Sequence, residues 1–190
     1  MFSATSSDAA RPTPDAGKES RRLERYGQAL IRAARRSRRE TMPTLHLICG
    51  LPGSGKSTVA RELDKLHPAL HLIPDEWMAR IVGTGYDEEK RTIIETIQLE
   101  IAEQALRLGV DVILENGFWT RKERDRYRAM AKALGAKAKL YFLDVPRDEL
   151  LRRLKRRNER LPPDTFHVQE SDLDRWISQF EAPTAEELET

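Results

Sequence analysis

The sequence predicts an α/β fold in which helices cover a parallel sheet, and three observations support this prediction. Short apolar segments alternate with helix-forming segments after residue 43. The first apolar segment breaks at a glycine-rich turn before a helix-forming stretch. Acidic residues follow several of the apolar segments, where strands would end. Because strands that alternate with helices pair in parallel through right-handed crossovers, these ends should gather at one edge of the sheet, where ligands bind.

The glycine-rich turn is a candidate phosphate-binding loop. Its sequence GLPGSGKS, over residues 50–57, matches the pattern G-x-x-x-x-G-K-[ST] at every fixed position. We expect a strand before it, over 44–49, and a helix after it that ends near Leu66. Glycines allow backbone angles that a Cβ would forbid, so successive N–H groups can surround a polyphosphate at the positive end of the helix. The alternative is a glycine-rich turn with an incidental lysine.

Single residues of this loop have predicted roles. Lys56 would place its charge at the β and γ oxygens of a nucleotide, and the Ser57 hydroxyl can ligate Mg²⁺. Thr58 continues the start of the helix. The predicted nucleotide-binding set is Gly50, Gly53, Ser54, Gly55, Lys56, Ser57 and Thr58. The loop therefore predicts a bound nucleotide with Mg²⁺.

The remaining elements follow from hydrophobic patterning. Apolar segments predict three further strands, over 69–74, 110–114 and 138–144. Helix-forming segments lie at 76–82, 121–134, 147–160 and 173–180. A long helix is expected from Asp87, because one helix face would hold Ile94, Ile97, Ile101, Ala105 and Leu108.

Two acidic residues at strand ends are candidates for chemistry. Asp75 follows the second strand, where a carboxylate can accept a proton from an acceptor hydroxyl; the alternative is a helix cap. Glu76 is interpreted as an acid of the first helical turn. Glu115 ends the third strand and would reach Mg²⁺ through water, with a substrate contact or a structural cap as alternatives. The metal residues predicted are thus Ser57 and Glu115.

The segment 147–160, RDELLRRLKRRNER, is a candidate lid. Leu150, Leu151 and Leu154 would face the core, and Asp148 with Arg152 and Glu149 with Arg153 are spaced as ion pairs. Further along, Arg156 and Arg157 follow Arg152 and Arg153 at a spacing of four residues. Like charges at this spacing repel each other unless an anion binds between them. The predicted catalytic set is therefore Asp75, Lys56, Arg153 and Arg157, with Arg160 as an alternative lid arginine. The competing interpretation is a solvated charged face.

Other polar residues are assigned more modest roles. An acceptor pocket after the third strand is predicted from Trp119, Arg121 and Arg124. The histidines His67, His71 and His167 show no metal-ligand spacing and are interpreted as incidental. Cys49 is the single cysteine, so the chain has no internal disulfide, and a buried thiol is expected.

The N-terminal segment differs in composition from the rest. Residues 1–42 contain 10 Lys and Arg against 5 Asp and Glu, so from a total of +2 the remaining chain is left with −3. The arginines, with Leu23, Tyr26, Leu30 and Ile31, predict either a solvated extension or a helix that contacts RNA, DNA or an acidic partner. The predicted domains are this extension (1–42), a core (43–182) and an acidic tail (183–190). With no membrane-spanning run or signal peptide in the sequence, a cytoplasmic monomer or dimer is expected.

Four stretches resemble the small phosphate-loop (P-loop) kinase-like ATP-binding proteins, a family of predicted kinases within an AAA-type grouping. These stretches are CGLPGSGKST, IPDEWM, VILENGFWTRKERDRYR and FLDVPRDELLRRLKRRN, and the resemblance spans about Leu45 to Phe180. It implies ATP and Mg²⁺ as cofactors and a P-loop NTPase three-layer sandwich. The implied parallel sheet has four or five strands in the order 2-3-1-4. The implied activity is phosphoryl transfer to an acceptor that is mostly unidentified.

The layout is also similar, more distantly, to polynucleotide 5′-kinases, zeta-type toxin kinases and chloramphenicol phosphotransferase. These proteins place a catalytic Asp after the second strand, and Asp75 matches that position. Polynucleotide kinases have an arginine three residues later, where this chain has Met78. Family members commonly have Asp where this chain has Glu115.

The predicted function is transfer of the γ-phosphate of ATP to a hydroxyl of a small molecule or nucleotide. One alternative is a polynucleotide 5′-hydroxyl kinase whose basic extension holds the strand. A second alternative is a non-catalytic or slow NTP-binding regulatory protein.

Overall fold

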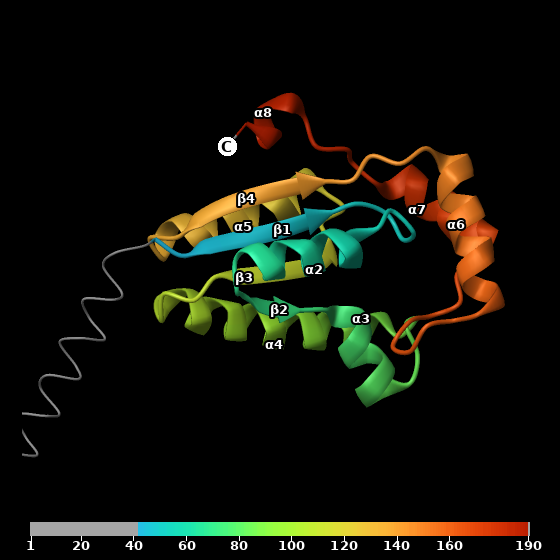
Figure 1. Ribbon diagram of the computed structural model, residues 1–190, viewed down its shortest axis with the longest axis horizontal. Coiled ribbons are helices and arrows are strands. Elements are labelled where there is room, and N and C mark those ends of the chain that lie inside the picture. The colour runs from blue at the N-terminus through green and yellow to red at the C-terminus, as the bar shows by residue number, and fades with distance from the viewer. Residues whose placement is uncertain (1–41, 190) are drawn as a thin grey trace, which may run out of the picture. The chain divides into compact units, whose positions relative to one another are not determined.

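The computed structural model describes residues 42–189, and Figure 1 shows their arrangement. The predictions for the arginine-rich extension, including its apolar residues, lie outside the described residues. In 42–189 no helix is long and apolar enough to cross a membrane.

The sheet has four parallel strands. They are β1 (Thr44–Cys49), β2 (Leu70–Leu72), β3 (Val112–Gly117) and β4 (Lys137–Phe142). Their order is β2-β3-β1-β4, so the predicted order 2-3-1-4 is confirmed. β1 lies in the centre, where Leu45 pairs with Val112 of β3 and with Ala138 of β4. The carboxyl ends of all four strands therefore lie at one edge.

Helices connect the strands and cover the sheet (Figure 1). Those that precede β4 are α2 (Lys56–Leu66), α3 (Pro74–Trp77), the π-helix η1 (Met78–Val82), α4 (Glu88–Arg107) and α5 (Arg121–Ala133). After β4 come α6 (Arg147–Glu159), α7 (Glu170–Gln179) and α8 (Ala185–Leu188). The predicted elements are present, with ends displaced by a few residues.

The core has one layer of side chains on each face of the sheet. On one face Leu47 and Leu114 pack with Ala102 of α4 and Tyr127 of α5. On the other face Ile48 and Ile113 pack with Ala60 of α2. Because side chains alternate along a strand, β1, β3 and β4 contribute to both layers, as the three-layer prediction requires.

The buried face of α4 differs from the prediction. Ile97 and Leu108 are 42% and 66% exposed. The predicted residues Ile94 and Ala105 are buried, together with Gln98, Ala102 and Leu106. The apolar spacing indicated the helix and part of its buried face correctly, but a glutamine occupies one inward position in place of Ile97.

The arginine-rich helix α6 packs on a small separate core. Leu150 and Leu154 are buried with Leu173 of α7, and Leu51 of the glycine-rich loop packs against them. The predicted pair of Glu149 with Arg153 is present, at 2.6 Å. The predicted pair of Asp148 with Arg152 is not: the Arg152 guanidinium bonds Glu149 instead.

The end of the chain is more ordered than an acidic tail suggests. Residues 185–188 form α8, and the Glu187 side chain is buried. Its carboxylate pairs with Arg124 at 2.8 Å and with Arg128 at 3.1 Å, both on α5. Two arginines of α5 thus compensate the charge of this buried acid, which the sequence analysis placed only in an acidic tail.

Candidate active site

The loop between β1 and α2 has the backbone of an anion site. Gly53 and Gly55 have φ angles of +86° and +101°, in the left-handed region that favours glycine. The Ser54 Oγ atom is buried and has no hydrogen-bond partner in residues 42–189. α2 begins after Gly55 with no side-chain cap and no acidic residue in its first turn. The N–H groups of Lys56 and Ser57 are therefore available to phosphate oxygens, whereas the Thr58 N–H donates to the Gly55 carbonyl oxygen at 3.0 Å.

Lys56 lies in the first turn of α2, and its ammonium group is not paired with a carboxylate in the described residues. Its Nζ atom donates to the Leu51 carbonyl oxygen at 3.2 Å, and no ion pair of Lys56 occurs in the described part of the chain. Burial lowers the pKa of Lys56, while the Glu115 and Asp75 charges raise it. A phosphate would supply the direct negative partner that this ammonium lacks.

Ser57 and Glu115, the two predicted metal residues, lie in contact. The Ser57 hydroxyl donates to Glu115 Oε1. Glu115 Oε2 lies 3.3 Å from His71 Nε2 of β2, although that pair has no hydrogen-bond geometry. A hydroxyl beside a buried carboxylate is a donor set that fits Mg²⁺. His71 belongs to this site and was missed, because only the pairing of β2 with β3 brings it to Glu115.

Asp75 does not cap its helix. Pro74 is the first residue of α3 and Ile73 is its N-cap, so the cap interpretation of Asp75 is wrong. The Asp75 side chain is 57% exposed, and its Oδ1 atom accepts from Arg91 Nη2 of α4 at 2.8 Å. Arg91 is a second residue that the sequence analysis missed. Its guanidinium lies beside the Asp75 carboxylate. Polynucleotide kinases have an arginine at the position of Met78, and Arg91 provides a guanidinium from another helix.

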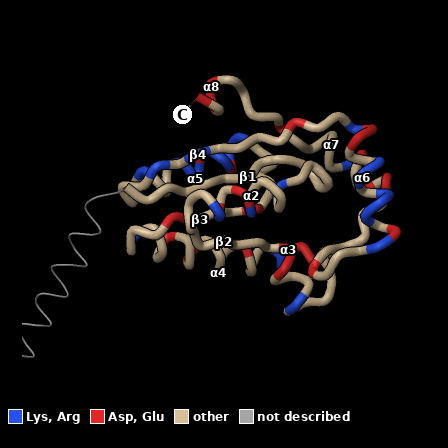
Figure 2. Tube along the Cα trace, viewed as in Figure 1, with Lys and Arg blue, Asp and Glu red and all other residues tan. Residues whose placement is uncertain are grey.

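The arginines of α6 differ in their positions. Arg153 Nη1 donates to the Ser54 carbonyl oxygen at 3.2 Å, so this side chain contacts the glycine-rich loop. Arg157 donates to the Phe166 carbonyl oxygen at 3.2 Å, but its buried Nε atom has no partner among the described residues. Burial lowers the pKa of Arg157, and the Asp75 charge opposes this shift. Arg160 is exposed. Figure 2 shows the basic and acidic residues along α6, at the same end of the sheet as α3.

The predicted acceptor residues separate in the structure. The Trp119 ring packs edge-on against Trp176 of α7, with 5.8 Å between the ring centroids. Arg121 is exposed and pairs with Asp125 and Glu186. Arg124 does not line a pocket: it is fully buried by its bonds to Glu187 and to the Phe118 and Glu181 carbonyl oxygens. Its role is structural, and the prediction for Arg124 is wrong.

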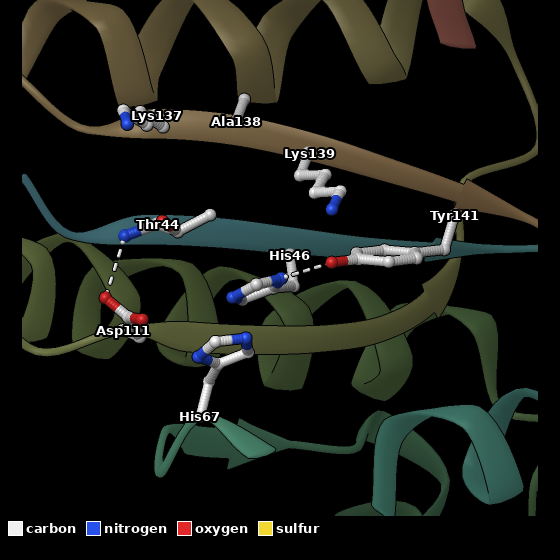
Figure 3. Close-up of a pocket in the computed structure, with 8 residues that line it drawn as sticks. All are labelled: Thr44, His46, His67, Asp111, Lys137, Ala138, Lys139 and Tyr141. Atoms are coloured by element: carbon white, nitrogen blue, oxygen red, sulfur yellow. Dashed lines mark hydrogen bonds between the residues drawn. The ribbon is translucent and has the colours of Figure 1, made fainter. Parts of the chain in front are cut away.

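A hollow lined by other polar residues lies at the opposite edge of the sheet (Figure 3). Its residues come from β1, from β4 and from the segments before β2 and β3: Thr44, His46, His67, Asp111, Lys137, Ala138, Lys139 and Tyr141. His46 contacts the Tyr141 hydroxyl at 3.0 Å, and Asp111 accepts from the Thr44 N–H. This hollow is remote from the glycine-rich loop and has no part in its chemistry.

The fold and the glycine-rich loop at the carboxyl edge of the sheet define the class of the protein: a P-loop α/β domain of the kinase-like type. Residues 45–183 match the model of an AAA domain family, and the chain belongs to that family.

Solved structures of kinases share the fold at low sequence identity. A gluconokinase from Sinorhizobium meliloti is 19% identical with a TM-score of 0.55, over 78% of this chain and 81% of that one. The Mycobacterium tuberculosis APS kinase CysC, in complex with AMPPNP and APS, is 19% identical with a TM-score of 0.52, over 75% and 84%. A chain of the Pnkp1/Rnl/Hen1 RNA repair complex is 21% identical with a TM-score of 0.59. That match covers 74% of this chain but 45% of the other, so this chain spans less than half of that relative.

Proposed function

We propose that this protein is an ATP-dependent phosphotransferase that phosphorylates a hydroxyl group. The observation that carries the proposal is the gathering of Lys56, Asp75 and Arg157 beside the glycine-rich loop. The Asp75 and Arg157 charges both affect the pKa of Lys56, which supports assigning the three groups to one site. Two cations beside a carboxylate that can accept a proton are among the parts of a phosphoryl-transfer site.

Each residue has a distinct part in the proposed reaction. The loop N–H groups and Lys56 bind the phosphates, and Ser57 with Glu115 would hold Mg²⁺, which offsets phosphate charge. Asp75 accepts the proton of the acceptor hydroxyl while the oxygen of that hydroxyl bonds to the γ-phosphorus. The bond from that phosphorus to the β-phosphate oxygen breaks, and ADP leaves. Arg153 and Arg157 stabilise the charge on the transferring group.

A polynucleotide 5′-hydroxyl kinase remains a second candidate. Polynucleotide kinases have an arginine where this chain has Met78, and the Arg91 guanidinium, 2.8 Å from Asp75, supplies a cation beside that carboxylate. The fold shared with a chain of an RNA repair complex also supports this candidate. The third candidate is a nucleotide-binding regulatory protein without transfer activity. Measuring phosphoryl transfer by the wild type and by Asp75→Asn distinguishes it from the two kinase candidates.

Nucleotide binding should require Lys56. Lys56→Ala removes a desolvated cation that has no ion pair in the described residues, so the ligand-free Tm should change little. Mg·ATP at 100 times its Kd should stabilise the wild type by about 2.7 kcal/mol, and this stabilisation should vanish in the variant. Thermal denaturation with and without Mg·ATP measures both effects. Lys65→Ala, on the exposed side of the same helix, is the control. Equal stabilisation of Lys56→Ala and wild type would exclude the proposed phosphate site.

Arg157→Ala should lower phosphoryl transfer by roughly 10², the scale of a lost transition-state donor. The side chain is partly buried beside Asp75 and Lys56, and its unpartnered Nε can bind an incoming phosphate oxygen. Single-turnover transfer at saturating ATP measures the effect. Arg156→Ala, the exposed neighbour, serves as the control. Equal rates for the two variants would remove Arg157 from the catalytic set.

A further inference from the structure

The segment of residues 160–169, which we call the strap, connects α6 to α7 and is anchored to α6. Asn158 of α6 donates from Nδ2 to the Val168 carbonyl oxygen at 2.7 Å and accepts from the Val168 N–H at 3.3 Å. The Val168 side chain is buried in one cluster with Leu150 of α6 and Leu173 of α7. The end of the strap next to α7 is therefore fixed to the small core that these two helices form.

The middle of the strap packs on the loop of residues 83–87, which lies between η1 and α4. The Phe166 ring is so close to Gly85 that a Cβ at this position would be 2.7 Å from Phe166 Cγ. Carbon atoms in contact are normally about 3.5–4.0 Å apart. The φ angle of Gly85 is not positive. The close approach of the ring, and not the backbone angle, is therefore what requires a glycine here.

Tyr86 adds a polar contact beside this apolar one. Its hydroxyl lies 2.7 Å from the His167 carbonyl oxygen and 3.1 Å from Asp172 Oδ2 of α7, and its single hydrogen can go to either acceptor. Figure 1 shows the strap beside the loop that follows η1. Two segments that are 81 residues apart in the sequence are thus joined at two neighbouring positions.

Hydrogen bonds lead from each side of this contact to a proposed catalytic group. The Phe166 carbonyl oxygen accepts from Arg157 Nη2 at 3.2 Å. The Gly85 carbonyl oxygen accepts from Arg91 Nη2, also at 3.2 Å, and the same nitrogen donates to Asp75 Oδ1 at 2.8 Å. The contact of Gly85 with Phe166 therefore links the lid arginine to the carboxylate that is proposed to bind the acceptor hydroxyl.

The Arg157 guanidinium has few other contacts that could fix its position. Within residues 42–189, its bond to the Phe166 carbonyl oxygen is the only hydrogen bond of the side chain, and no ion pair of Arg157 occurs. The Nε atom is buried without a partner among the same residues. A misplacement of about 1 Å can cost a catalytic group a factor of roughly 10². Whatever holds the Phe166 carbonyl oxygen therefore also determines how well Arg157 can bind the transferring phosphoryl group.

We propose that Gly85 and Phe166 are positioning residues, which hold the strap against the 83–87 loop and thereby keep the Arg157 guanidinium at the site of the transferring phosphoryl group. Both act through Arg157. The bare Cα of Gly85 admits the ring, and the packed ring fixes the carbonyl oxygen that accepts from the guanidinium. This inference rests on the proposed phosphotransferase and adds to its site two residues that lie outside the glycine-rich loop and the lid helix.

A transition-state mimic tests this role with the full chain and without an acceptor. The affinity for Mg·ADP would be titrated with and without aluminium fluoride, which mimics a phosphoryl group in transfer. In the wild type, aluminium fluoride should tighten the binding of Mg·ADP by roughly tenfold or more. This gain should fall below about threefold in Arg157→Ala, in Gly85→Ala and in Phe166→Ala, because a donor to the phosphoryl group is lost or misplaced.

Two further variants separate positioning from a general disturbance of the loop. Gly83→Ala is the matched control: it has a positive φ angle in the same loop, but its Cβ would meet nothing within 4 Å, so the gain should be retained. The double variant Gly85→Ala/Arg157→Ala should bind like Arg157→Ala alone, because a positioning residue has no effect once the group that it positions is removed.

Each other outcome contradicts the inference. Retention of the gain in Gly85→Ala and Phe166→Ala, its loss in Gly83→Ala, or a further loss in the double variant would overturn the positioning role and leave the phosphotransferase proposal standing. Retention of the gain in Arg157→Ala would show that the contact does not act through this arginine. Absence of any gain in the wild type, or binding of Mg·ADP that does not depend on Lys56, would overturn the phosphotransferase proposal as well.

Discussion

Asp75→Asn should lower phosphoryl transfer by roughly 10² or more while the affinity for ATP stays within a few-fold. The carboxylate is more than half exposed, and its single described hydrogen bond, from Arg91, leaves one oxygen free for an acceptor hydroxyl. Asparagine keeps the shape of the side chain but cannot take up the proton. Single-turnover transfer to an active acceptor and a separate ATP titration measure the two quantities.

The structure makes this test sharper than the sequence alone allowed. Because Asp75 is not the N-cap of α3, the substitution should leave the ligand-free Tm within about 2 °C of wild type. Glu76→Gln, on the same short helix, is the control and should transfer normally. If Asp75→Asn transferred phosphate at the wild-type rate, the base would have to be another carboxylate, such as Glu95 or Glu115. If no variant or wild-type protein transferred phosphate, the regulatory alternative would stand.

Local sequence signals predicted the elements that local physics determines. The strand, the glycine-rich turn and the helix over 44–66 could be predicted from the residues of that segment alone, because backbone angles and hydrophobic patterning are determined within a few residues. The position of Asp75 after the second strand followed from the same patterning. The sheet order followed from the resemblance to known kinases and is confirmed by the pairing of β1 with both β3 and β4.

Contacts between distant segments could not be predicted in this way. Arg91 reaches Asp75 across 16 residues, and the pair of His71 with Glu115 depends on the register of two strands. The patterning of α4 favoured Ile97 over Gln98 for the buried face, because hydrophobicity cannot anticipate an inward glutamine. Arg124 shows the reverse error: an arginine near the site was assigned to substrate, whereas an acid 63 residues later buries it.

That acid, Glu187, should have the largest effect on stability of any single residue considered. Glu187→Ala removes both carboxylate oxygens that bond Arg124, which is fully buried. Breaking a buried pair by removing one partner costs roughly 3 to 5 kcal/mol, because a desolvated charge is left behind. Chemical denaturation of the full chain should show this loss. Glu186→Ala, whose side chain is 81% exposed, should change the unfolding free energy by less than about 0.5 kcal/mol.

The dependence of stability on pH provides an independent check on the same pair. Hydrogen bonding from Arg124 lowers the pKa of Glu187 to about 2, from an ordinary value of 4.5. A carboxyl with a lowered folded-state pKa contributes its full stability above about pH 4.5 and loses it as the pH falls toward 2. The wild type should therefore lose more stability over this interval than Glu187→Ala. Parallel pH profiles for the two proteins would show instead that the buried Glu187 carboxylate makes no net contribution to stability.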